Sequence, residues 1–462
     1  MSAQSDHAAR SAIRPVKESA EDDLIARDGV VAVDIAEKVT DGQPTGQLSI
    51  VVFVEKKKPE SRLSKAQTIP KEINGVPTDV QELTVELFSA VRYEEVSTLV
   101  DASAYTTLSG GIGIGPARTV FLSPPDVPSA GNYVFVGTLG ALVKDRSSGS
   151  TMALTNFHVA CVNNSWTVGD RQVQPSRVDG GSATTGQFGS LTRATLSENV
   201  DGSVITLDAG KAWTPTVVDI GGVAGKGLAS VGMAVQKRGR TTEHTYGNVV
   251  STDFTVSIDY GSDVGTHTLR HQVRIDTDTT KSTRFSDHGD SGSVVMDSNR
   301  NVVGLLFGGS NDGVMTFANP IQAVLDELSV DLLVDKPTLI TKPAVCDFLT
   351  RPSVCSLKSR VVICNIISRY VICNLVTKPV VCDLVTKPVI CDQIVSRPAC
   401  PPDGPGDPRG PVEFPIPNQI PGLSGAEQDW YGSMGPALDD TFVAGYLAAL
   451  EAVAAEEERQ GQ

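Results

Sequence analysis

Ser291 has the sequence surroundings of a catalytic nucleophile, in the run Gly289-Asp-Ser-Gly-Ser293. A serine hydroxyl attacks a carbonyl carbon only when a base takes its proton and backbone N–H groups face the oxyanion that forms. A glycine two residues before the serine permits a turn that exposes the N–H groups of Gly289 and Ser291 together. Gly-Asp-Ser runs also form ordinary turns, so the assignment needs a base and an acid elsewhere in the chain.

His158 and Asp201 are the candidates for these two roles. His158 follows the apolar run that begins at Ala153, and Asp201 stands at the start of the apolar run that ends at Leu207. A carboxylate beside a buried strand is costly unless it is paired, and an imidazole N–H is a suitable partner. Taken alone, the histidine fits a structural role and the acid a turn. With Ser291 they give the order His, Asp, Ser, which predicts a catalytic triad.

The elements that must position these residues are short strands. Between residues 107 and 330, β-branched runs are separated by Gly, Ser, Asn and Asp every 8–12 residues. This spacing is typical of an all-β barrel or sandwich. The expected strands include Tyr133–Val143, Val200–Leu207, Val231–Lys237, Gly247–Phe254 and Val302–Leu306.

Three segments in this order resemble the chymotrypsin/trypsin-fold serine proteases: Leu154-Thr-Asn-Phe-His158, Val200-Asp-Gly-Ser-Val-Ile205 and Gly289–Ser293. Residues 237–247 look like the Gly-Arg-Thr-Thr segment of bacterial α-lytic-type members. Residues 303–309 look like the strand that lines the substrate groove. The resemblance is greatest to signal-less, disulfide-free bacterial trypsin-like proteins and the plant narrow-leaf type. It covers residues 107–330 and implies a mainly β fold of two six-stranded barrels with the site between them.

The resemblance also implies roles for single residues. His158 takes the proton of Ser291 and later gives it to the leaving amine, while Asp201 holds the imidazole in its tautomer. The N–H groups of Gly289 and Ser291 form the oxyanion hole. Asp290 is expected to be a buried structural acid.

The same resemblance implies a substrate-binding set, which consists of Phe285, Phe307, Gly308 and Gly309. Phe285 stands six residues before the serine, where trypsin has an acid, so we expect no preference for Lys or Arg before the scissile bond. A medium apolar or small residue is expected there instead. His288 either contacts substrate or is a solvated loop residue. Val159 replaces the cysteine of secreted relatives, so their disulfide is absent.

The segments before residue 107 carry no recognisable chemistry. Residues 1–26 are polar and are predicted to be disordered. Residues 27–106 are predicted to form a small α/β accessory domain, with strands over 29–35, 47–54 and 79–88 and a short helix within 56–66. We expect this domain to be a cover or a folding aid.

The segments after residue 330 begin with nine-residue repeats over 331–400. Cysteines recur there at positions 346, 355, 364, 373, 382, 391 and 400. Zinc sites use much shorter cysteine spacings, so no metal is expected. The repeats form either stacked rungs or an extended arm. A Pro-rich linker over 401–436 and a helix within 437–462 are expected to follow. This arm recruits a protein partner or is trimmed by Ser291.

Charge and composition limit the partners. A net charge of −15 disfavours nucleic acid and anionic membranes. No apolar run is long enough to span a membrane, and the first residues contain no secretory signal, so we expect a cytoplasmic protein. Cys161 is the one cysteine before residue 340, as expected of a reducing compartment. No cofactor is expected. The predicted function is a serine endopeptidase acting on proteins or peptides, and the alternative is a catalytically silent, protease-fold peptide-binding scaffold.

Overall fold

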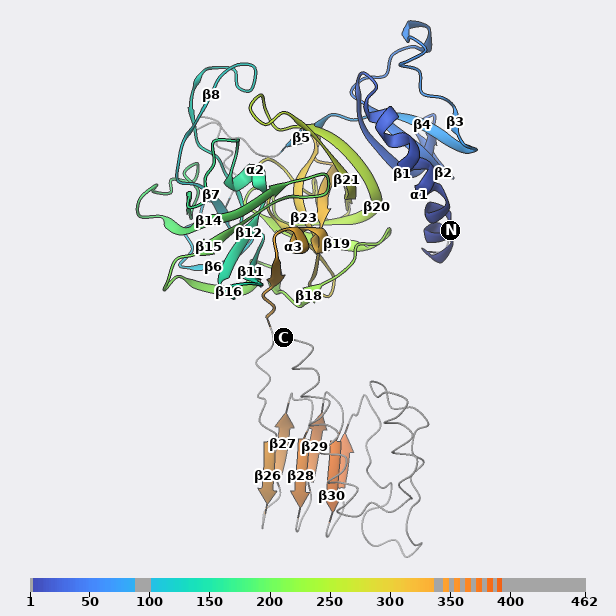
Figure 1. Ribbon diagram of the computed structural model, residues 1–462. Helices are drawn as coiled ribbons and strands as arrows, with labels where there is room; N and C mark the ends of the chain where they lie inside the picture. Colours follow the sequence, from blue (N-terminus) through green and yellow to red (C-terminus); the bar gives the residue numbers. More distant parts are fainter. Residues whose placement is uncertain are drawn as a thin grey trace, which may run out of the picture. The chain divides into compact units, whose positions relative to one another are not determined.

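The computed structural model describes residues 3–87 and 101–335 and six short strands between residues 344 and 392 (Figure 1). The chain divides into two compact units, Met1–Lys336 and Pro337–Gln462. The first unit is mainly β, as the spacing of its apolar runs predicts. Its helices are α1 (Ala3–Ile25), α2 (Phe157–Ala160) and α3 (Ile321–Glu327), with a 3₁₀ turn η1 (Glu60–Arg62) where a short helix was expected.

An eight-stranded sheet carries His158 and Asp201, with the order β10-β7-β13-β14-β15-β12-β11-β25. Its strands are β7 (Gly113–Pro116), β10 (Gly137–Thr138), β11 (Ala141–Asp145), β12 (Thr151–Thr155), β13 (Arg171–Val173), β14 (Gln187–Leu196), β15 (Asp201–Leu207) and β25 (Val330–Leu332). Small sheets beside it contain β6 (Thr107–Gly110), β16 (Ala212–Val217), β17 (Gly221–Gly222), β8 (Val120–Leu122) and β9 (Gly131–Tyr133). Alternating apolar residues of β12 and β15 supply two cores, with Leu154 and Val204 in one and Ala153 and Ile205 in the other.

A twelve-stranded sheet carries Ser291, which lies in the loop before β22. Within this sheet the pairing runs β19-β22-β23-β24-β21-β20, and β19 also pairs with β20, so these six strands form a closed circuit. They are β19 (Ala234–Gly239), β20 (Glu243–Asp259), β21 (Thr266–Thr277), β22 (Val294–Asp297), β23 (Asn301–Ser310) and β24 (Met315–Pro320). β18 (Gly225–Lys226) pairs with β23.

The N-terminal strands extend this second sheet. β1 (Val30–Thr40) pairs antiparallel with β20, and β2 (Gln43–Val54), β4 (Val76–Glu82) and β3 (Glu72–Ile73) follow in that order. Asp41 and Gly42, both at positive φ, make the expected turn between β1 and β2. Phe53 of β2 shares an apolar core with Phe254 of β20. The N-terminal segment is therefore packed on the second sheet through continuous strand pairing and a common core.

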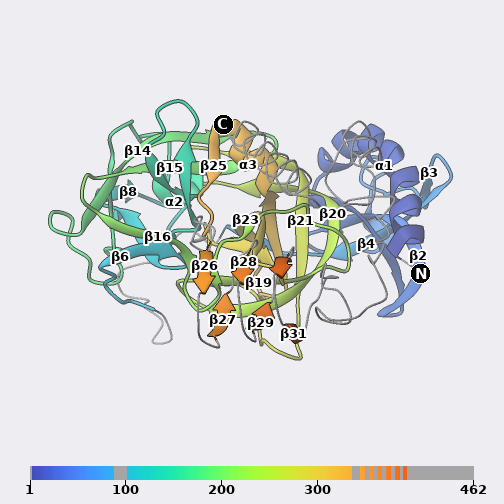
Figure 2. The ribbon, with the colours of Figure 1, turned by 90° about the horizontal axis from the view of Figure 1, so that it is seen from below.

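The prediction that residues 1–26 are disordered is wrong, because helix α1 occupies Ala3–Ile25. Figures 1 and 2 show α1 beside the N-terminal strands. Its apolar residues recur at helical spacing and pack on β1 and β2; they are Ile13, Val16, Ala20 and Leu24. Its polar residues are also paired: Lys17 and Glu21 are buried together and both contact Thr255 of β20. The polar residues of this segment, which suggested disorder, therefore include the ones that contact β20.

The described residues of the second unit are six short strands from successive nine-residue repeats. Its strands are β26 (Ala344–Phe348), β27 (Ser353–Leu357), β28 (Val362–Ile366), β29 (Val371–Leu375), β30 (Val380–Leu384) and β31 (Val389–Asp392). Strands of alternate repeats pair in parallel, in the orders β26-β28-β30 and β27-β29-β31. The register places Cys346 opposite Cys364 and Cys364 opposite Cys382. The expected Pro-rich linker over 401–436 and the helix within 437–462 lie outside the described residues.

Candidate active site

His158 and Asp201 are in contact at the ends of two neighbouring strands, β12 and β15. β12 ends at Thr155, and the short helix α2 that follows carries His158, while Asp201 is the first residue of β15. Thr155 pairs with Ser203, which brings the two residues to the same end of the sheet. The Nδ1 atom of His158 lies 2.5 Å from Oδ2 of Asp201, and the backbone N–H of His158 donates to Oδ1 at 3.3 Å.

Ser291 lies close to this pair. A Cβ atom placed on Gly137 would lie 2.5 Å from the side chain of Val159, the residue after His158, and 3.0 Å from the carbonyl oxygen of Ser291. Both segments therefore pack on one glycine, which leaves no room there for a side chain.

The hydrogen bond between Ser291 and His158 is not formed. The Ser291 hydroxyl donates instead to the carbonyl oxygen of Phe307 at 3.1 Å. His158 Nε2 is buried and has no hydrogen-bond partner among the described residues. Ser291 is 0% exposed and His158 is 2% exposed. The site thus holds an imidazole nitrogen that is available to accept a proton and a hydroxyl that is turned to another acceptor.

The turn around Ser291 requires its two glycines. Gly289 and Gly292 have φ angles of 94° and 93°, a region that residues with a Cβ rarely adopt. A Cβ on Gly289 would also lie 2.5 Å from Oγ1 of Thr241. Within residues 3–87 and 101–335, the N–H groups of Gly289 and Ser291 donate no hydrogen bond. Two unpaired donors beside a serine can stabilise an oxyanion.

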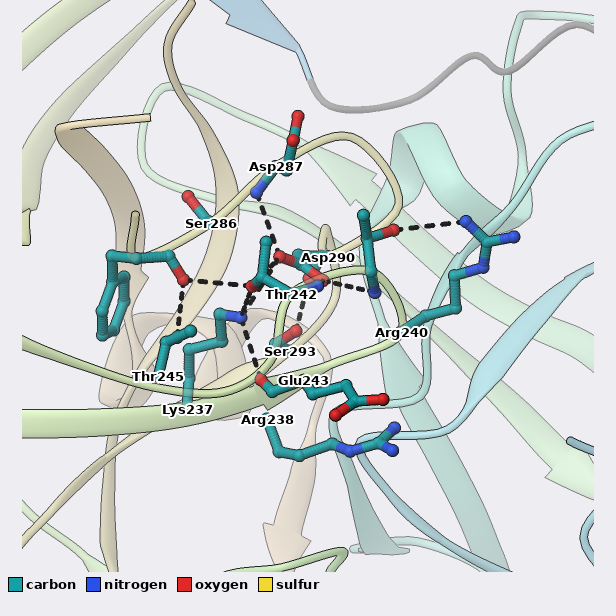
Figure 3. Close-up of polar contacts among 12 residues, drawn as sticks. Lys237, Arg238, Arg240, Thr242, Glu243, Thr245, Ser286, Asp287, Asp290 and Ser293 are labelled. Atoms are coloured by element: carbon teal, nitrogen blue, oxygen red, sulfur yellow. Dashed lines mark hydrogen bonds and ion pairs between the residues drawn. The ribbon is translucent and has the colours of Figure 1, made fainter. Parts of the chain in front are cut away.

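Asp290 anchors this turn from inside the protein, as expected for a buried structural acid (Figure 3). Oδ1 accepts the N–H groups of Thr241 at 2.8 Å and Thr242 at 3.1 Å. Oδ2 accepts the Thr242 hydroxyl at 2.6 Å and the Asp287 N–H at 3.0 Å. Lys237 Nζ donates to Oδ2 at 3.2 Å. The carboxylate is thus surrounded by donors from two loops.

Lys237 is the buried countercharge of Asp290, and both side chains are fully buried. Burial lowers the pKa of Lys237, while the nearby Asp290 carboxylate opposes that shift. Nζ also contacts the Thr242 hydroxyl and the carbonyl oxygen of Glu243. The ammonium group therefore connects the loop after β19 to the turn that carries Ser291.

A groove of about 440 Å³ opens beside His158. Its lining includes Tyr260, His288 and the three residues of β5 (Val85–Leu87). β5 pairs antiparallel with the end of β23, with Leu87 opposite Gly308 and Glu86 opposite Gly309. A segment of the N-terminal part of the chain therefore lies on two of the residues predicted to bind substrate.

Close contacts hold β5 on this strand. A Cβ on Gly308 would lie 2.8 Å from the carbonyl oxygen of Glu86, so the glycine permits the approach. Oε2 of Glu86 lies 3.2 Å from Nε2 of His288. Val85 and Leu87 pack against the apolar core that contains Phe307.

The aromatic members of the predicted substrate-binding set are buried. Phe285 is packed in the core of the second sheet with Val249 and Ile275, and Lys237 Nζ lies 5.9 Å from the centre of its ring. Phe307 is also fully buried. His288 is partly exposed at the groove, where it contacts Glu86 rather than solvent alone.

Sequence reasoning missed three residues of this site. Tyr260 donates its hydroxyl to Asp201, Lys237 pairs with Asp290, and Glu86 contacts His288. Lys237 stands two residues before Gly239, where the Gly-Arg-Thr-Thr run begins, and this position was a usable signal. Tyr260 and Glu86 carry no local signal, because their partners at the site, Asp201 and His288, lie far from them in the sequence.

Neither a metal site nor a membrane-spanning helix is found in the described part of the chain. No group of three or more His, Cys, Asp or Glu side chains there is arranged to hold a metal ion. No helix there is long and apolar enough to cross a membrane.

Comparisons with known proteins give matches among solved structures. No protein-family model and no curated protein matches the chain. The chain is similar to protease A of Thermobifida fusca, with 23% identity, a TM-score of 0.35, and coverage of 49% of this chain and 99% of that one. It is similar to a Nocardiopsis protease, with 20% identity, a TM-score of 0.35, and coverage of 49% and 98%. It is also similar to a chymotrypsin of Cellulomonas bogoriensis, with 20% identity, a TM-score of 0.34, and coverage of 49% and 98%. These neighbours are chymotrypsin-like serine proteases, the family that the sequence motifs resemble.

Proposed function

We propose that the chain is a serine endopeptidase with Ser291 as nucleophile, His158 as general base and Asp201 as the acid that orients it. The observation that carries this proposal is the 2.5 Å contact between His158 Nδ1 and Asp201, together with the unpaired Nε2 atom. An imidazole that is fixed on one nitrogen and unoccupied on the other is suited to proton transfer.

The proposed reaction begins with a rotation of the Ser291 side chain from Phe307 toward His158. The hydroxyl oxygen attacks the peptide carbonyl carbon while Nε2 takes its proton, and the N–H groups of Gly289 and Ser291 stabilise the oxyanion. His158 then gives that proton to the leaving amine, which breaks the C–N bond and leaves an acyl-enzyme. Water attacks the acyl-enzyme by the same route, which releases the acid and restores Ser291.

We propose further that each of the two large sheets contains one of the two six-stranded barrels of this fold, and that β23 is the strand that receives substrate. Phe285 places no charge near the pocket, so cleavage is expected after medium apolar or small residues rather than Lys or Arg. Profiling with a mixed peptide library tests this specificity. A dominant Lys or Arg preference would show that another residue supplies the charge.

The accessory N-terminal segment is proposed to cover the site. β5 lies on Gly308 and Gly309, where the proposed substrate strand would pair, and Ser291 is buried. The cover must leave this edge before a protein substrate can bind. Glu86→Lys replaces the contact with His288 by a repulsion whenever His288 is protonated and by a lost hydrogen bond otherwise. Peptide cleavage should therefore rise in this variant, while Glu72→Lys, a matched change on β3 away from the groove, should leave it unaltered.

Turnover of a cleavable peptide is the test of the enzymatic function. Wild type, Glu86→Lys, Ser291→Ala and Ser262→Ala are compared, since Ser262 lies on the same groove but outside the proposed triad. We expect more cleavage by Glu86→Lys than by wild type, and the same cleavage by Ser262→Ala as by wild type. The rate of peptide cleavage should fall by several orders of magnitude in Ser291→Ala. Equal and measurable cleavage by wild type and Ser291→Ala would refute the assignment of the nucleophile.

A catalytically silent peptide-binding protein is the second candidate. It is favoured by the hydrogen bond that Ser291 makes with Phe307 in place of His158. Under this alternative Glu86→Lys binds peptides in the groove but cleaves none of them.

The C-terminal repeats are proposed to recruit a protein partner or to be trimmed by Ser291. Intact mass of the wild-type and Ser291→Ala chains after incubation separates the two. Loss of C-terminal fragments from the wild type alone supports trimming. Intact chains, together with loss of partner binding on deletion of residues 338–462, support recruitment.

A further inference from the structure

The Asp201 carboxylate has a second side-chain partner besides His158. The Tyr260 hydroxyl donates to Oδ2 of Asp201 at 2.9 Å, and the same oxygen lies 2.5 Å from His158 Nδ1. The rings of Tyr260 and His158 meet edge to face, with centroids 6.1 Å apart. One carboxylate oxygen therefore serves both side chains.

This hydroxyl matters because Asp201 is fully buried. A buried carboxylate needs donors to offset the loss of water. Among the described residues, the side-chain donors to its oxygens are His158 and Tyr260; the remaining donor is the backbone N–H of His158. Without the hydroxyl, only contacts from His158 itself would fix the carboxylate.

The tyrosine is itself held firmly. It belongs to the apolar core that also contains Phe254, Phe307 and Phe317, and it lies just after β20 ends. Three residues before the end of this strand, Val256 pairs with Ala32 of β1. The hydroxyl is thus presented by a packed ring rather than by a mobile loop.

The phenol is a donor over the whole working pH range. Burial raises the pKa of Tyr260 well above its ordinary value, and the charge of Asp201 and the hydrogen bond to it act in the same direction. A further titratable group near it is His267, whose ring lies 5.6 Å from that of Tyr260. The charge of Asp201 also acts on the buried thiol of Cys161.

We propose that Tyr260 is a positioning residue of the triad, which holds Asp201 through its hydroxyl so that the carboxylate orients His158. This rests on the proposed protease function. Its consequence is specific: the hydroxyl withdraws negative charge from Oδ2 and so tempers the attraction of Asp201 for the protonated imidazole. Removal of the hydroxyl should loosen the carboxylate and favour the imidazolium form.

The test uses the full chain and the variant Tyr260→Phe, which removes one oxygen and keeps the ring. The low-field proton resonance of His158 Nδ1 is followed against pH, and the rate of inactivation by a fluorophosphonate probe is measured in parallel. We expect the His158 Nδ1 proton resonance to move. The acid limb of the plot of inactivation rate against pH should shift to higher pH. The inactivation rate should fall about tenfold, as for one hydrogen bond to a charged group. Tyr246→Phe, on β20 with its ring tilted against that of His244, is the control and should change neither readout.

Fluorotyrosine at position 260 gives the opposite perturbation, because a more acidic phenol donates a stronger hydrogen bond. The acid limb should then shift to lower pH, which a purely structural role of the ring would not produce. An unchanged His158 resonance and an unchanged pH profile in Tyr260→Phe would overturn the proposal. If wild type and Glu86→Lys are both inert to the probe, the protease function fails, while the resonance still decides the role of Tyr260.

Discussion

Replacement of Lys237 by methionine tests whether the buried ion pair between Lys237 and Asp290 holds the turn that carries Ser291. Lys237 and Asp290 are both 0% exposed, and Met is close to Lys in length. Removing one partner of a buried pair usually costs about 3–5 kcal/mol, because the other charge stays buried. Asp290 keeps four hydrogen bonds, from the N–H groups of Thr241, Thr242 and Asp287 and from the Thr242 hydroxyl. We therefore expect Lys237→Met to lower the free energy of unfolding by the low end of this range, about 3 kcal/mol.

This cost has two readouts. At about 2.1 cal/mol/K of unfolding entropy per residue, a unit of the size of Met1–Lys336 has about 0.7 kcal/mol/K, which predicts a fall in Tm of about 4 °C in a calorimetric scan. Because the turn from Asp287 to Ser291 relaxes, fluorophosphonate labelling should also slow more than tenfold at a temperature where the variant is folded.

Two controls accompany this variant. Lys281→Met removes an exposed lysine paired with Asp278 and should change neither readout. The double variant Lys237→Met, Asp290→Asn removes both charges and should recover part of the lost Tm. If Lys237→Met melts and labels like the wild type, the ion pair does not support the turn.

Three further predictions concern other parts of the first unit. Hydrogen bonds from Tyr105, Ser103 and Arg238 outweigh burial and lower the pKa of Asp101 to about 2, so the stability that this carboxylate gives the folded protein is complete above about pH 4 and is lost as the pH falls toward 2. Asp101→Asn should therefore flatten the dependence of Tm on pH in this window, and an unchanged slope would contradict the assignment. Burial and the charge of Asp201 raise the pKa of the Cys161 thiol, so iodoacetamide at pH 8 should spare it in the native protein, as peptide mapping by mass would show, and rapid alkylation would contradict its burial. Gly308→Ala would set a Cβ 2.8 Å from the Glu86 carbonyl oxygen, so hydrogen exchange at Val85–Leu87 should accelerate, and unchanged protection would show that β5 is held by other contacts.

The residues of the candidate triad could be found from sequence because their signals are local. A glycine on either side of Asp290 and Ser291 marks a turn at positive φ, and the structure has that turn. His158 and Asp201 stand at the ends of apolar runs that become β12 and β15, and adjacent pairing of these strands brings them into contact. Strand spacing likewise predicted a mainly β first unit.

The features that sequence did not reveal depend on contacts between distant segments. Helix α1 was missed because average polarity concealed the spacing of Ile13, Val16, Ala20 and Leu24, and because the partner of Lys17 and Glu21 is Thr255, more than 200 residues away. The position of β5 on β23 is equally non-local. No pattern within Val85–Leu87 indicates which strand it pairs with, and three residues carry too little periodicity to decide it.

The central claim is that His158 activates Ser291, and mass mapping of a fluorophosphonate adduct tests it most directly. The full chain and Glu86→Lys are treated with the probe and digested. The peptide that contains Ser291 is then quantified beside the same peptide from His158→Gln. The account predicts a single adduct on Ser291, faster in Glu86→Lys and nearly absent in His158→Gln. Adduct formation at another serine, or labelling of Ser291 that does not depend on His158, would contradict it.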